Sequence, residues 1–152
     1  MPARCPDLDQ ATAIRIDDLY LEASRLRLRR NTAIDGTTVF KLAKKYPSDK
    51  PMSRPMTNLY LDATEFELLG RLPGRRVFKR RFRIDDGFIV DVFDGALDGL
   101  ILGEIEADLA MVSAAAMPSW AAAEVTNNMH YDGGSISHWT TDDLAAHRVH
   151  YG

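Results

Sequence analysis

The chain has 152 residues, 45% of them hydrophobic and 27% charged, and its formal net charge at pH 7 is −3. This length and composition suit one domain with a hydrophobic core, and the acidic balance disfavours a general nucleic-acid-binding protein. The single cysteine, Cys5, excludes an internal disulfide framework. The sequence contains no apolar run of the roughly 20 residues that span a bilayer and no apolar signal peptide, so a cytoplasmic protein is expected.

The first half of the chain predicts four strands and one helix. Residues 14–21 and 25–30 alternate between apolar and polar side chains, and residues 37–46 form the return strand of a hairpin. The proline-rich segment 47–55 predicts a loop, and residues 58–62 predict a short strand. A helix is expected over residues 63–72, with Thr64 as its N-cap and Glu67 completing a capping box.

The second half adds four strands, which we expect at residues 76–84, 88–94, 100–107 and 123–126. Helices are expected over 107–116 and 142–149. About eight short strands with two or three helices indicate an α+β fold with a curved antiparallel sheet or barrel.

Strand alternation sorts the charged side chains onto one face of this sheet. The pattern places Arg25, Arg27 and Arg29 together, and Lys79, Arg81 and Arg83 together. Two interpretations of this face stay open. It could lie in water, as one face of many antiparallel sheets does. It could also turn inward and line a polar tunnel.

An inward charged face would suit a polyphosphate ligand. Arginine forks match phosphate oxygens with paired hydrogen bonds, and clustered cations repel one another until an anion binds. Carboxylates come from other strands, at Asp91, Glu104 and Glu106. The pair of glutamates suits Mg²⁺ or Mn²⁺, which prefer oxygen ligands and bridge to phosphates. The sequence therefore predicts a metal-assisted polyphosphate site.

A series of motifs, in this order along the chain, resembles the CYTH domain, also called the triphosphate tunnel metalloenzyme family. The resemblance covers roughly residues 14–137, leaving residues 1–13 as an irregular N-terminus and 138–152 as a tail with a short helix. The motifs are R-L-R-L-R (25–29), F-K-L (40–42), L-D-A-T-E-F-E-L-L (61–69), G-R-R-V-F-K-R-R-F (74–82), V-D-V-F-D-G (90–95), G-L-I-L-G-E-I-E (99–106) and E-V-T (124–126).

The resemblance implies an eight-stranded antiparallel β-barrel-like tunnel that binds a triphosphate compound with a divalent cation. It also implies specific roles. Triphosphate-binding residues would be Arg27, Arg29, Lys41, Lys79 and Arg81, and metal ligands would be Asp91, Glu104 and Glu106. Lys41 is preferred to Lys44, because Lys44 shares its face with Phe40 and Leu42. The resemblance assigns no catalytic side chain.

The sequence also departs from the family pattern. The family opens with an E-x-E-x-K strand, and nothing before Ile14 fits it. Met56, Asn58 and Ile89 occupy positions where the family often has glutamate.

Two functions are therefore expected. The first is metal-dependent binding and hydrolysis of inorganic triphosphate, thiamine triphosphate or a nucleotide. The second is a degenerate module that binds polyphosphate or nucleotide without hydrolysis. We expect a triphosphate-containing small molecule as the partner, no membrane or nucleic acid, and a homodimer formed through an exposed sheet edge.

Overall fold

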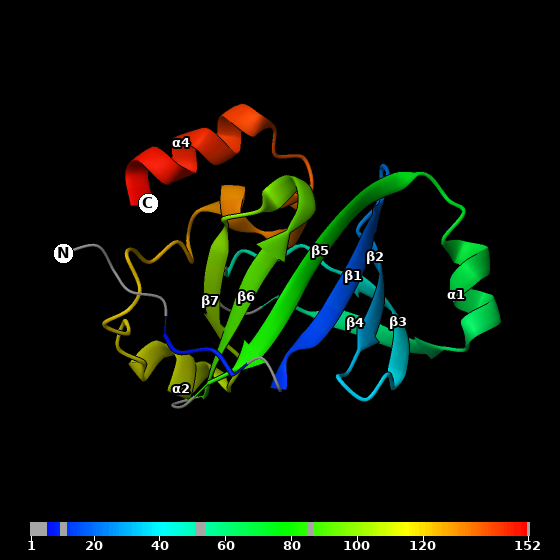
Figure 1. The fold of residues 1–152 in the computed structure, drawn as a ribbon, viewed down its shortest axis with the longest axis horizontal. Coiled ribbons are helices and arrows are strands. Elements are labelled where there is room, and N and C mark those ends of the chain that lie inside the picture. Colours follow the sequence, from blue (N-terminus) through cyan, green and yellow to red (C-terminus); the bar gives the residue numbers. More distant parts are fainter. Residues whose placement is uncertain (1–5, 10–11, 51–53, 85–86, 152) are drawn as a thin grey trace.

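The computed structural model describes residues 6–9, 12–50, 54–84 and 87–151. Its centre is one antiparallel sheet with the strand order β4-β3-β2-β1-β5-β6-β7 (Figure 1). The strands are β1 (Ile14–Leu21), β2 (Leu26–Thr32), β3 (Thr38–Lys45), β4 (Met56–Leu61), β5 (Gly74–Arg83), β6 (Phe88–Asp94) and β7 (Ile101–Ile105). The helices are α1 (Ala63–Leu69), α2 (Leu109–Ala114), α3 (Gly133–Ile136) and α4 (Thr141–Tyr151), with 3-10 turns η3 (Gly95–Leu97) and η4 (Met129–Tyr131).

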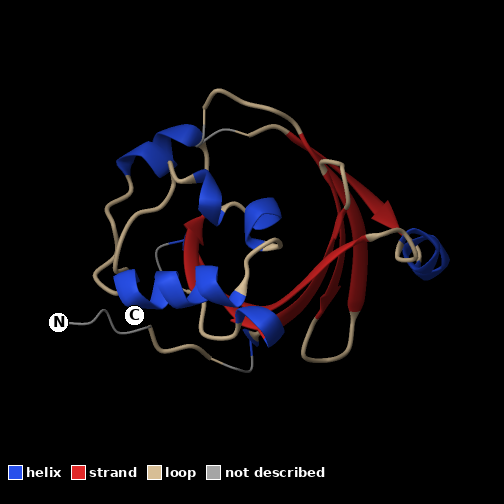
Figure 2. Cartoon of the chain, turned by 90° about the horizontal axis from the view of Figure 1, so that it is seen from above, coloured by secondary structure: helices blue, strands red, loops and turns tan. Residues whose placement is uncertain are grey.

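The sheet is strongly curved, and α1 lies outside the curve at the right of Figure 2. Alternate residues of β1 and β2 face this convex side, where Leu19, Leu21 and Leu28 pack around the buried Phe66 of α1. Burial of these apolar side chains holds the helix against the sheet. The intervening residues of the same strands must face the concave side.

The concave side is partly filled by the C-terminal segment (Figure 2). Val77 of β5 and Phe93 of β6 form a second buried cluster with Ile136 of α3 and Leu144 of α4. Arg148 of α4 donates a hydrogen bond to the main-chain oxygen of Asp98, at 2.5 Å, and so ties the last helix to the turn before β7. The segment therefore covers one apolar part of the concave face and leaves a polar part beside it.

The fold class is confirmed in its coarser form, an antiparallel sheet with a few short helices, and two details of the prediction are wrong. Among the described residues the sheet has seven strands, with β4 and β7 as its edges, so it does not close into a barrel. The strand expected at 123–126 is irregular chain. Its alternation spans only four residues, which is too short to specify a strand without a neighbour to pair with.

The capping box of α1 begins two residues earlier than expected. Asp62, and not Thr64, is the N-cap, and its carboxylate accepts a hydrogen bond from the Glu65 N–H at 2.8 Å. The Glu65 side chain returns the bond to the Asp62 N–H at 2.9 Å. An aspartate is at least as good an N-cap as threonine, and starting here also buries Phe66.

Candidate anion-binding site

The predicted basic residues of three strands lie together on the concave face. Tyr20 pairs with Arg27 and Asp18 with Arg29 across β1 and β2, so these side chains share that face. Arg27 is only 9% exposed and Arg29 only 8%. The alternating pattern left open that this face lies in water. The two arginines are too deeply buried for that interpretation. Burial of neighbouring guanidinium groups is unfavourable unless negative charge compensates it.

The Asp18 carboxylate supplies part of that compensation. Its two oxygens accept hydrogen bonds from Nε and Nη2 of Arg29, at 2.6 and 2.7 Å. Burial alone would raise the pKa of Asp18, but Arg29, Arg27 and Lys79 outweigh it and the pKa falls below its usual range. Burial is the largest single influence on Arg29 and lowers its pKa, but the hydrogen bond to Asp18 and the Asp18 charge together raise the pKa by more, so it lies above its usual value. This pair is a closed unit with its charges balanced.

A second balanced network joins β5, β6 and β7. Asp91 accepts hydrogen bonds from Lys79 at 2.6 Å and from Nε and Nη2 of Arg81 at 2.8 Å each. Arg81 also donates to Glu104, at 2.5 Å, and its Nη1 lies 3.5 Å from Glu106. Burial raises the pKa of Asp91, but Arg81 and Lys79 lower it more strongly, so the carboxylate stays ionised. Lys79 and Arg81 therefore already have carboxylate partners.

Arg27 is compensated much less well. Its nearest carboxylate oxygen, in Asp18, is 3.9 Å from Nε, beyond hydrogen-bond range. Within the described residues, Nε has no hydrogen-bond partner although it is buried. Burial and the neighbouring Arg29 lower the pKa of Arg27, and the charge of Asp18 together with the Tyr20 hydroxyl opposes this only in part. The guanidinium is thus a buried cation with an unused donor.

Lys45, at the end of β3, lies in the same part of the concave face. Burial lowers the pKa of Lys45 first, and Arg27 lowers it further, while Asp132 and Glu104 act in the opposite direction. No ion pair joins Lys45 to a carboxylate within the described part of the chain. Lys45 belongs to β3 and Glu104 to β7, two strands that do not pair in the sheet. Their interaction reflects the curvature that brings the two strands to face each other.

Lys41 and Lys44 point in different directions, as expected from their positions on β3. Lys41 pairs across the strands with Arg29, and its ammonium lies 5.2 Å from the ring centre of Tyr60 on β4. Lys44 is exposed and lies over the ring of Tyr46. Lys41 is therefore the better placed of the two for an anion on the concave face.

Of the three predicted metal ligands, the two glutamates have oxygens available for a metal ion. The side chains of Glu104 and Glu106 are 49% and 58% exposed, and each contacts Arg81 through one oxygen. Both oxygens of Asp91 already accept hydrogen bonds. The described residues contain no group of three or more histidine, cysteine, aspartate or glutamate side chains arranged to hold a metal. The pair of glutamates fits a metal that takes its other ligands from water and substrate phosphates, as Mg²⁺ commonly does.

Asp18, Tyr20 and Lys45 belong to the site but were not among the residues predicted for it from the sequence. Asp18 could have been found, because it shares a face with Ile14 and Ile16 beside a pair of arginines. A carboxylate at such a position indicates a buried ion pair. Lys45 could not have been preferred to Lys41 from the alternating pattern, since both fall on the same face.

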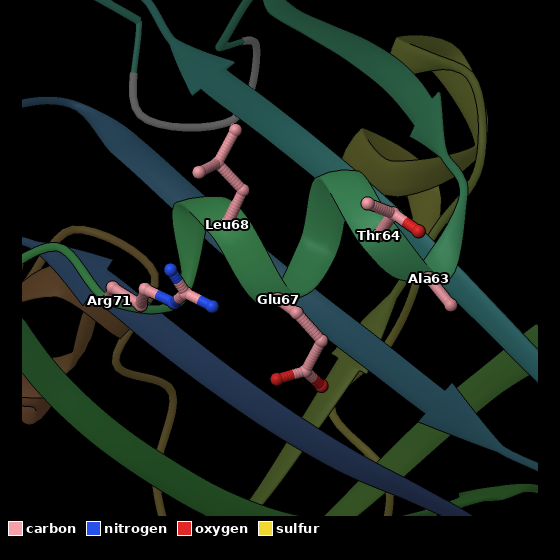
Figure 3. A pocket seen from close by; sticks show the side chains of 5 residues that line it. All are labelled: Ala63, Thr64, Glu67, Leu68 and Arg71. Atoms are coloured by element: carbon pink, nitrogen blue, oxygen red, sulfur yellow. The ribbon is translucent and has the colours of Figure 1, made fainter.

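Other surface features lie away from this site. A shallow hollow runs along α1 on the convex side of the sheet (Figure 3), and it contains none of the predicted site residues. It is lined by Ala63, Thr64, Glu67, Leu68 and Arg71. Within the part of the chain that the structure describes, no helix has the length and apolar character needed to cross a membrane.

Comparison with known proteins gives one informative result. Neither a protein-family model nor a curated protein matches the chain. The crystal structure of the inorganic triphosphatase NE1496 does match, with a TM-score of 0.56 and 29% sequence identity. The match covers 90% of this chain and 92% of that one. The resemblance drawn from the sequence motifs is thus confirmed, and the chain has the fold of the CYTH, or triphosphate tunnel metalloenzyme, family.

Proposed function

We propose that this chain binds a triphosphate compound in the basic part of its concave face, where Arg27, Lys41 and Lys45 contact phosphate oxygens. The observation that carries the proposal is the buried Arg27 guanidinium, whose Nε lacks a partner in the described structure. A phosphate oxygen would satisfy this donor and neutralise the repulsion between Arg27 and Lys45. The similarity to an inorganic triphosphatase supports the same ligand chemistry.

Arg29, Lys79 and Arg81 remain predicted ligands, with a smaller expected contribution to binding. Their charges are already balanced by Asp18 and Asp91, so a bound anion gains less from them. The residues that contact the anion recognise phosphate groups, which inorganic triphosphate, thiamine triphosphate and nucleotides share.

We further propose that Glu104 and Glu106 hold Mg²⁺ or Mn²⁺ when the triphosphate is bound, and that the bound compound is hydrolysed. The metal would offset phosphate charge and make water a better nucleophile. Phosphoryl transfer depends mainly on positioning and charge stabilisation, so a nucleophilic side chain is not required. In this scheme the hydrogen bonds to Asp91 hold the Arg81 guanidinium in place, and the guanidinium in turn contacts both glutamates.

Binding without hydrolysis is the second candidate function. It is favoured by the scarcity of free carboxylates, because Asp18 and Asp91 are both saturated by cations in the described structure. A module of this kind would bind tripolyphosphate with or without a divalent metal and release no phosphate.

Calorimetry with sodium tripolyphosphate tests the binding proposal. Arg27→Gln and Lys45→Gln should each weaken binding by about tenfold or more, since each removes a charge-assisted contact. The matched control is Lys44→Gln, which removes the same charge from the exposed side of the same strand. Equal affinities for all four proteins, or no binding by the unaltered chain, would refute the proposed site.

Phosphate release in the presence of Mg²⁺ or Mn²⁺ separates the two candidate functions. If the chain is an enzyme, Glu104→Gln and Glu106→Gln should abolish metal-dependent release while tripolyphosphate binding without metal persists. Glu67→Gln on α1 is the control, because its exposed side chain lies on the convex side. Binding with no release under any metal condition would establish the binding module.

A further inference from the structure

A fourth cation, Arg54, approaches the basic part of the concave face from the loop before β4. Its guanidinium is paired with Asp132, and the next residue, Gly133, lies against Tyr20, the strand partner of Arg27. The Arg54 charge also lowers the pKa of Lys45, after the larger effects of burial and Arg27. Arg54 lies in irregular chain in the proline-rich segment, before β4 begins at Met56, so it does not belong to the sheet. It was not among the predicted site residues.

Arg54 is held by weak contacts from the C-terminal segment. Its Nη1 lies 3.6 Å from Oδ2 of Asp132, which is too long for a good hydrogen bond. Its Nη2 donates to the sulfur of Met129, at 2.7 Å, and a thioether is a weak acceptor. Both the Arg54 and the Asp132 side chains are 24% exposed, so the pair is accessible to a small anion.

Asp132 is the carboxylate of the C-terminal segment that faces this basic cluster. Its Oδ1 accepts a hydrogen bond from the Ser135 N–H at 3.1 Å and caps α3, while Oδ2 is directed at Arg54. Its charge also raises the pKa of Lys45, against burial and Arg27. The next residue, Gly133, contacts the Tyr20 hydroxyl, because a Cβ at Gly133 would lie 2.2 Å from that oxygen. Gly133 thus joins this segment to Tyr20, the strand partner of Arg27, while the charge of Asp132 acts on Lys45.

We propose that Arg54 is an additional ligand for the bound polyphosphate. In the free protein Arg54 is paired with Asp132, and when the anion binds its guanidinium exchanges Asp132 for a phosphate group. The inference rests on the proposed triphosphate function and adds a specificity-determining pair to it. A phosphate group offers Arg54 two oxygens in fork geometry, which Asp132 and Met129 do not provide. Asp132 repels the same phosphate, so it penalises anions too weakly charged to displace it.

Asp132→Asn isolates this role. Asparagine caps a helix as well as aspartate does, so α3 keeps its N-cap while the negative charge disappears. We expect sodium tripolyphosphate to bind several-fold more tightly to Asp132→Asn and about tenfold more weakly to Arg54→Gln, measured by calorimetry at fixed ionic strength. In the double variant, the gain from Asp132→Asn should shrink, because there is no Arg54 to release.

The matched control is Asp62→Asn, which changes charge and cap in the same way at α1, on the convex side. It should leave the affinity unchanged. Thermal unfolding of each variant excludes a loss of fold as the cause, and a purely structural Arg54–Asp132 contact would not make Asp132→Asn bind more tightly.

The outcomes separate this inference from the function on which it rests. If the unaltered chain does not bind tripolyphosphate, the proposed function is wrong. If it binds, and Arg27→Gln weakens binding while Asp132→Asn and Arg54→Gln behave like Asp62→Asn, the function stands and the role of the Arg54–Asp132 pair is refuted.

Discussion

Single residues on the concave face differ in how completely their charges are balanced. Arg29 has a hydrogen-bonded carboxylate in Asp18, whereas Arg27, two residues earlier on the same strand, has only a distant one. Both are about equally buried, so the difference lies in pairing and not in access to water. An anionic ligand gains most where charge is buried and unbalanced, which is why Arg27 and Lys45 are central to the proposed site.

The pH dependence of binding should report the state of Lys45. Burial and Arg27 lower the pKa of Lys45 below the 10.5 of an ordinary lysine, so its charge is lost at a less alkaline pH. A bound anion favours the charged form, and affinity should therefore fall as pH rises toward that lowered pKa. We expect calorimetry between about pH 7 and 10 to show this fall, with proton uptake on binding.

Lys45→Arg provides the comparison, because a guanidinium stays charged throughout that range. Its affinity should decline less at alkaline pH. The same decline in both proteins would mean that another group controls the pH dependence.

Among the elements, β7 shows how packing on the convex side supports the concave site. Gly103 lies between the two strand positions that carry Leu102 and Glu104, and the Trp120 ring covers it on the opposite face. Trp120 also contacts Phe88 of β6 edge to face, with ring centres 5.7 Å apart. The indole therefore clamps the edge strand that presents Glu104.

Gly103→Ala should destabilise this strand. A Cβ there would lie 2.5 Å from the Trp120 ring, so the indole must shift. We expect the free energy of unfolding to fall by about 1–3 kcal/mol, measured by urea unfolding followed through tryptophan fluorescence and circular dichroism. Trp120→Leu should remove most of the additional cost of Gly103→Ala, and full additivity of the two changes would contradict the proposed clamp.

For the molecule as a whole, the distribution of charge matters more than its total. The net charge is −3, because acidic residues outnumber basic ones over the whole chain. The concave face nevertheless carries a cluster of arginine and lysine side chains. The open sheet has β4 at one edge, where Leu59 is 56% and Tyr60 is 72% exposed. An edge strand with exposed apolar side chains and unpaired main-chain groups favours pairing with another chain.

The predicted homodimer through an exposed edge can be tested at this scale. We expect sedimentation velocity to detect association that increases with protein concentration and is weakened by Leu59→Lys, which places a charge on the edge strand. Leu68→Lys is the control, since Leu68 is 64% exposed but lies on α1. A monomer at every concentration, or equal effects of the two substitutions, would exclude pairing through β4.

The sequence by itself indicated the seven strands that form the sheet in the described part of the chain, along with an eighth that does not form, and the face on which the charges of each strand lie. Side chains alternate along a strand whatever its neighbours, so Arg27, Arg29, Lys79, Arg81 and Asp91 could be assigned to one face from the pattern alone. The order of the basic and acidic motifs was also sufficient for the family resemblance, which the solved triphosphatase structure supports.

Only the tertiary structure decided which of these charges are paired and whether the sheet closes. Ion pairs such as Lys79–Asp91 depend on strand register, and the approach of Lys45, Glu104, Arg54 and Asp132 depends on the curvature of the sheet and the position of the C-terminal segment. These are contacts between residues far apart in the chain, and local alternation carries no information about them. For that reason the sequence predicted on which face of the sheet the site residues lie. Which of the described cations lack a hydrogen-bonded carboxylate partner could be determined only from the tertiary structure.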